Sequence, residues 1–146
     1  MEKFLKTIFF ASSILIMSNS SCSKEEIEGA NFVSLNKNFE LALNEKAVVE
    51  KKLVINLTNI ADSRCPLTVQ CVWAGNVTVG LTVSDFNSNK QEINLCKGDC
   101  SSTNLNDSAI VNIDNSKYTV ILKEVNPLPK TKNSAEKKVT LLVTKN

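Results

Sequence analysis

The chain has 146 residues, and its 17 Lys and Arg nearly balance its 15 Asp and Glu. This balance argues against a nucleic-acid-binding protein, because such proteins carry a strong basic excess or a basic stripe. The chain has no His, its carboxylates are scattered, and no Ser lies in a nucleophile motif. We therefore expect no catalytic residue, and we expect neither a metal nor a cofactor.

The N-terminus has the features of a secretion signal. Lys3 and Lys6 provide a positive start, residues 8–17 are mainly apolar, and small polar residues lead to Cys22. An apolar run of about ten residues is too short to cross a bilayer as a helix, which takes roughly 20. The pattern predicts a signal peptide over residues 1–21.

Cys22 lies in a sequence that resembles the processing site of bacterial lipoproteins. Residues 20–26 read Ser-Ser-Cys-Ser-Lys-Glu-Glu, and in lipoproteins such a Cys becomes the acylated first residue of the mature protein. In one large group of Gram-negative bacteria, a Lys and two acids after this Cys direct the protein to the outer face of the outer membrane. The resemblance implies a lipid anchor at Cys22 and exposure on the cell surface. The periplasmic face and a conventional cut after Ser20 stay open as alternatives.

The number of cysteines supports the lipoprotein interpretation. Five Cys is an odd number for an exported protein. If Cys22 carries the lipid, an even number remains for two disulfides, namely Cys65, Cys71, Cys96 and Cys100. Two or more acyl chains on Cys22 would hold the protein stably at its membrane.

The remaining sequence predicts an all-β domain. Residues 22–35 are largely polar and are expected to form a lipidated tether, and residues 36–146 are expected to form the domain. Apolar and polar residues alternate along several short runs that Asn-, Asp-, Ser-, Gly- or Lys-rich breaks separate. This pattern predicts one antiparallel β-sandwich, Ig-like or related. One weak helical candidate covers residues 41–49. The apolar positions of the runs include Leu53, Ile55, Leu57, Val77, Val79, Leu81, Val83, Ile93, Leu95, Val111, Ile113, Tyr118, Val120, Leu122, Val139, Leu141 and Val143.

The segment from Asp62 to Gly75 concentrates the rare residues of the chain, including its only Arg and its only Trp. In a structural interpretation, Cys65 and Cys71 close a loop that Pro66 helps to turn. Trp73 then plugs the sandwich, and Gly75 permits a close backbone approach. In a binding interpretation, Arg64 and the loop form a recognition tip.

Two chemical interpretations of the same cysteines stay open at this point. A four-thiolate zinc site would use Cys65, Cys71, Cys96 and Cys100, although zinc ligands are usually spaced two to four residues apart. A thiol-redox site would need a stabilised thiolate, which is common in Cys-x2-Cys, and neither pair has that spacing. An exported protein favours disulfides over both.

The segment also resembles a block found in small exported bacterial proteins of unassigned function, many of them lipoproteins. The block consists of residues 62–66 (Asp-Ser-Arg-Cys-Pro), four variable residues, and residues 71–75 (Cys-Val-Trp-Ala-Gly). In these proteins alternating strands follow, then a Val-x-Pro-x-Pro segment, here residues 125–129, and then a last strand, here residues 139–143. The resemblance implies that Cys65 pairs with Cys71, which leaves Cys96 to pair with Cys100. It implies no activity.

From the sequence we expect a lipid-anchored protein of the cell envelope whose β-domain is not an enzyme. Its role is expected to be binding or structural support at the outer membrane. The alternative is an inhibitor or recognition module that presents the loop from Arg64 to Cys71 to a protein partner, such as a protease. The expected partners are the membrane, through Cys22, and an envelope protein, but no nucleic acid.

Overall fold

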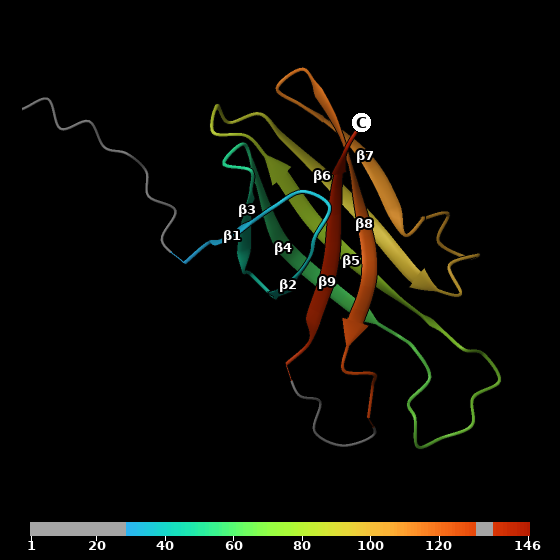
Figure 1. Cartoon of the computed structure of the whole chain (residues 1–146). Helices are drawn as coiled ribbons and strands as arrows, with labels where there is room; N and C mark the ends of the chain where they lie inside the picture. The colour runs from blue at the N-terminus through green and yellow to red at the C-terminus, as the bar shows by residue number, and fades with distance from the viewer. Residues whose placement is uncertain (1–28, 131–135) are drawn as a thin grey trace, which may run out of the picture.

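The computed structural model describes residues 29–130 and 136–146 (Figure 1). Within these ranges the chain forms nine β-strands and no α-helix, and therefore no helix that could cross a membrane. The strands form two sheets, which confirms the predicted all-β sandwich. The predicted signal peptide and the predicted lipidation site at Cys22 lie outside the described residues.

The first sheet has five strands in the order β1-β3-β4-β5-β6. Neighbouring strands are antiparallel, except that β1 runs parallel to β3. The bounds of these strands are Asn31–Val33 (β1), Lys46–Val49 (β3), Leu53–Asp62 (β4), Asn76–Ser84 (β5) and Lys90–Gly98 (β6).

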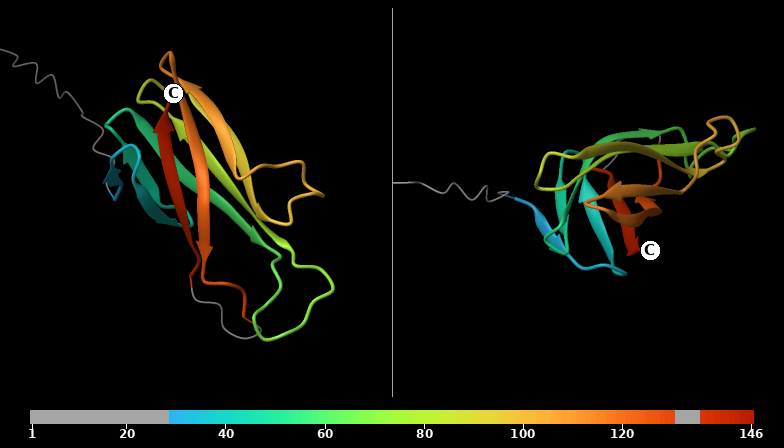
Figure 2. Two further views of the ribbon diagram at one scale, coloured as in Figure 1. Left: turned by 45° about the vertical axis from the view of Figure 1, so that its right-hand side comes forward. Right: turned by 90° about the horizontal axis from the view of Figure 1, so that it is seen from above.

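The second sheet has four antiparallel strands in the order β2-β9-β8-β7. It packs against the first sheet as a second layer, as the two views of Figure 2 show. The bounds of its strands are Asn38–Ala42 (β2), Ser108–Ile113 (β7), Ser116–Asn126 (β8) and Lys138–Lys145 (β9).

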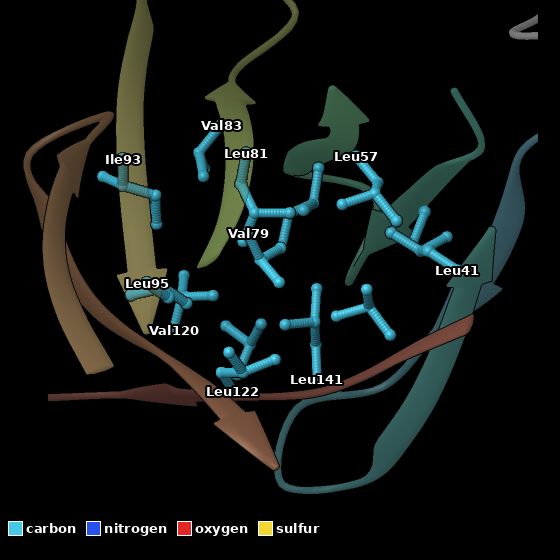
Figure 3. Packing of buried hydrophobic residues seen from close by; sticks show 14 of the residues in the cluster. Leu41, Leu57, Val79, Leu81, Val83, Ile93, Leu95, Val120, Leu122 and Leu141 are labelled. Carbon is cyan, nitrogen blue, oxygen red and sulfur yellow. The ribbon is translucent and has the colours of Figure 1, made fainter. Parts of the chain in front are cut away.

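The hydrophobic core lies between the two sheets (Figure 3). Every second residue of a strand points inward, because successive side chains in a strand lie on opposite faces. The alternating residues that the sequence singled out supply most of this core, and their burial is the main favourable term in folding. Core residues from both sheets include Leu41, Leu57, Val79, Leu81, Val83, Ile93, Leu95, Val120, Leu122 and Leu141.

The hairpin between β7 and β8 shows how the polar breaks turn the chain. Asp114 and Asn115 both have positive φ angles, of 50° and 54°. Two central residues in this region are typical of a type I′ turn, whose twist matches that of the flanking strands. Asn and Asp tolerate this conformation better than other residues with side chains. The sequence-based prediction of a turn here is confirmed.

Two expectations about the start of the domain are wrong. The helical candidate at residues 41–49 is instead the end of β2, a turn, and β3. The chain reverses because Asn44 takes a φ of 67°, and the Glu45 carboxylate accepts a hydrogen bond of 2.8 Å from the Ala42 N–H. The expected tether also ends earlier than residue 35, because Phe32 in β1 pairs with Val48 in β3.

Candidate functional site: the β4–β5 loop

Residues 63–75 form the longest described loop of the domain and join β4 to β5 at one end of the sandwich. The loop projects beyond the ends of the sheets, as the green segment in Figure 1 and in the left view of Figure 2 shows. The β6–β7 and β8–β9 connections lie at the same end, because the end of β6 at Gly98 pairs with the start of β5 at Asn76, and Arg64 contacts Pro127 of the β8–β9 connection. The site is therefore assembled from three connections that are far apart in the sequence.

A disulfide closes the outer part of the loop. Cys65 and Cys71 are bonded with a Cα–Cα distance of 5.9 Å. Below the disulfide the hairpin ladder continues, because the Cys65 N–H donates to the Ala74 carbonyl at 2.8 Å and the Ser63 N–H donates to the Asn76 carbonyl at 2.8 Å. The loop is thus a stapled extension of the β4–β5 hairpin.

The second disulfide joins Cys96 and Cys100 at the end of β6. Both pairings are those that the family resemblance implied. Four bonded cysteines offer no thiolate ligand, so the four-thiolate zinc site is not formed in this structure. Among the described residues, no group of three or more Cys, Asp or Glu side chains could hold a metal ion.

Gly75 allows the base of the loop to pass close to the opposite strand. Its φ is +74°, and a Cβ at this position would collide with the Ser63 carbonyl. Gly98 has a φ of +102°, and a Cβ there would lie 2.7 Å from the Gly75 carbonyl oxygen. The close approach predicted for Gly75 is therefore confirmed, and Gly98 makes a matching approach from the neighbouring strand.

Arg64 lies in an ion-pair cluster at the base of the loop. Its guanidinium binds the Asp62 carboxylate in a bidentate manner, at 2.8 Å from Nε and 2.7 Å from Nη2. The Lys137 ammonium binds the same carboxylate at 2.7 Å. Both cations also donate to the Pro127 carbonyl, at 3.4 Å and 3.3 Å. The cluster therefore ties β4 of one sheet to the β8–β9 connection of the other.

The Asp62 side chain is only 3% exposed, whereas the Arg64 and Lys137 side chains are 14% and 21% exposed. Burial alone would raise the pKa of the Asp62 carboxyl, but the hydrogen bonds from Arg64 and Lys137 outweigh it and lower this pKa from 3.8 to about 2. Asp62 and Arg64 can pair because residues two apart on an extended chain lie on the same face. The geometry does not present Arg64 at the tip of the loop.

Trp73 does not plug the sandwich, and this prediction is wrong. Its side chain is 47% exposed, and its indole N–H donates to the Asp99 carboxylate at 2.7 Å. Trp73 is not part of the alternating run of β5, because Gly75 with its positive φ interrupts the extended chain and β5 begins only at Asn76. Trp73 therefore belongs to the loop and not to the core.

Asp99 connects the loop to the second disulfide, and the sequence did not single it out. Hydrogen bonds from Ser101 and then Trp73 lower the pKa of this carboxyl. The backbone carbonyl of Asp99 accepts from the buried Asn76 side chain at 2.8 Å, and its N–H donates to the Gly75 carbonyl at 3.1 Å. Its position between two paired Cys was the one signal in the sequence that could have revealed it.

The outer part of the loop carries apolar side chains into solvent. We call the side chains of Leu67, Val69, Val72 and Trp73 the apolar tip. Leu67 is 68% exposed and Val72 is completely exposed. No charged residue occurs from Cys65 to Asn76. The outer part of the loop therefore presents an uncharged surface with four exposed apolar side chains to solvent.

Comparisons with protein-family profiles, with curated proteins and with solved structures found no match.

Proposed function

We propose that the chain is a lipid-anchored protein of the cell envelope, acylated at Cys22 and held in the outer membrane on its outer face. Its β-sandwich has a binding or structural role and is not an enzyme. The observation that carries the proposal is the pairing of the cysteines. The two disulfides use every Cys of the domain, so the odd Cys of an exported chain is Cys22, behind a basic and apolar N-terminal segment.

The non-enzymatic role is supported by the polar groups of the site. Asp62, Arg64 and Lys137 satisfy one another in a partly buried cluster, and a charge that is neutralised in this way is a poor general acid, base or nucleophile. The hydrogen bonds of Asp99 likewise fix the position of Trp73. These residues hold the loop in one conformation, and a rigid loop loses less conformational entropy on binding.

The anchor is tested by metabolic labelling with a radioactive or alkyne-bearing fatty acid in the bacterium that produces the protein. We expect label in the wild-type protein and in a Ser23→Ala control, and none in Cys22→Ala. Unlabelled wild-type protein would contradict the proposal.

The membrane face is tested by protease treatment of intact cells. We expect cleavage of the wild type and protection of a Lys24→Ala, Glu25→Ala, Glu26→Ala triple variant, which would stay on the periplasmic side.

A second candidate is an inhibitor or recognition module that presents the stapled loop to a protein partner. The exposure of the apolar tip favours it, because apolar and aromatic side chains supply most of the energy at interfaces. Its contacts would then be Leu67, Val72 and Trp73, since Arg64 is engaged with Asp62. Binding to an isolated partner should then be lost in Val72→Asp; unchanged binding would exclude the module.

A further inference from the structure

The apolar tip is the densest group of exposed apolar side chains in the described part of the chain. Nine large apolar side chains are exposed in residues 29–130 and 136–146, and four of them come from the seven residues between Leu67 and Trp73. A fifth, Leu128, lies on the β8–β9 connection at the same end of the sandwich. Single exposed apolar residues need no explanation, but a cluster on one projecting loop marks an interaction site.

The tip projects from the end of the sandwich (Figure 1), and its backbone is partly bonded within the protein. The Val69 N–H donates to the Pro66 carbonyl at 3.2 Å, and the Leu67 N–H donates to the Pro129 carbonyl at 3.4 Å. The disulfide between Cys65 and Cys71 keeps the loop in this shape. Internal bonding matters for entry into lipid, because an unsatisfied backbone group costs several kcal/mol there.

The charges around the tip nearly cancel. We call the charged residues of the β4–β5, β6–β7 and β8–β9 connections and of the terminal residues of the adjoining strands the collar. In the sequence the collar has five cations and four anions, so its net charge is +1. The cations are Arg64, Lys130, Lys132, Lys137 and Lys138, and the anions are Asp62, Asp99, Asp107 and Glu136. Attachment through this end therefore depends more on apolar contact than on net charge.

These observations favour a lipid surface over a protein. Charged groups fix the register of many protein interfaces, whereas residues 65–76 carry no charge and expose the aliphatic side chains of Leu67, Val69 and Val72. A bilayer needs no such matching, and it accepts a projecting apolar loop whose Trp lies at the level of the headgroups. We propose that the apolar tip inserts into the interfacial region of the bilayer as a second attachment point.

The inference rests on the proposed anchor at Cys22, because the anchor confines the domain near a membrane. Cys22 lies seven residues before Gly29, the first described residue, and this length of chain reaches roughly 25 Å at most. The nine residues of β5 span about 30 Å. The far end of the domain can therefore touch the same bilayer when the sandwich tilts. Confinement by the anchor raises the effective concentration of the apolar tip at the bilayer surface. Even weak insertion is then sufficient to hold the tip at the membrane.

Trp73 provides a direct probe, because it is the only Trp of the chain. The full-length mature protein would be reconstituted into vesicles of phosphatidylethanolamine and phosphatidylglycerol, and Trp73 emission would be recorded with and without lipids brominated near the headgroup end of their acyl chains. We expect a shift to shorter wavelength and strong quenching. We expect both to be lost in Val72→Asp, and both to be kept in the matched control Ile110→Asp, whose side chain is 57% exposed on β7.

A variant without the anchor separates the two proposals. Cys22→Ala protein added to the same vesicles should show a weaker version of the same shift, with little change when the phosphatidylglycerol fraction rises, because the net charge of the collar is only +1. Unquenched Trp73 in lipidated, vesicle-bound protein would overturn the inference while leaving the anchor intact. A photocrosslinker at position 72 that joins one defined protein in living cells, with Trp73 unquenched in vesicles, would also overturn it in favour of protein recognition.

Discussion

The Asp62 cluster makes the stability of the domain depend on pH in a specific way. Replacing Asp62 with Asn keeps the size of the side chain but removes the charge that Arg64 and Lys137 share. We expect Asp62→Asn to lower the free energy of unfolding near neutral pH. We expect the difference from the wild type to shrink as the pH falls.

The size of this stability difference follows from the pKa of Asp62. This pKa is about 2 in the folded protein, whereas the ordinary value for an Asp carboxyl is 3.8. This difference corresponds to about 2 kcal/mol of stability. It is an upper value, because solvent reaches Arg64 and Lys137 and screens the pair. Since the folded pKa is the lower one, the contribution is complete well above pH 3.8 and is lost as the pH falls through about 2.

The assay is urea unfolding of the wild type and Asp62→Asn at pH 7 and at about pH 2, with Trp73 fluorescence and circular dichroism as probes. Glu92→Gln serves as a control, because Glu92 is exposed on β6 and a surface change should stay within about 0.5 kcal/mol. If Asp62→Asn is as stable as the wild type at pH 7, the cluster does not stabilise the fold. If the loss is equal at both pH values, it does not arise from the charge.

Three further predictions concern the same loop. Gly75→Ala should destabilise the domain by more than about 1 kcal/mol in thermal unfolding, because φ is +74° and the Cβ meets the Ser63 carbonyl; wild-type stability would contradict the close approach. The double variant Cys65→Ser, Cys71→Ser should lose about 2 kcal/mol in urea unfolding, as expected for a short closed loop, and an unchanged midpoint would show that the staple does not stabilise the fold. Asp99→Asn should alter the emission of Trp73 and leave the free energy of unfolding within about 0.5 kcal/mol of the wild-type value; identical emission would refute the contact.

The fold was predictable from the sequence, because alternation along strands such as β5 and β8 records directly which side chains face the core. The turn at Asp114 and Asn115 was predictable for a similar reason, since its residue types match the φ angles that the turn requires. Both signals are local. They do not depend on which strands become neighbours.

The arrangement of the site was less predictable, because it depends on contacts between distant segments. Nothing near Arg64 in the sequence indicates that Lys137 completes its cluster with Asp62 from the other sheet. Trp73 was misplaced because the residue types give no sign that the backbone leaves the β region at Gly75, between Trp73 and β5. The strand β1 was taken for a tether because three residues are too few to show alternation.

The most direct test of the account is the intact mass of the mature protein extracted from the membrane. The account predicts a chain that begins at Cys22, carries acyl groups on that residue, and loses its two disulfides, gaining four hydrogens, only on reduction. A chain that begins at Ser21 or earlier, or that carries no acyl group at Cys22, would contradict the central claim.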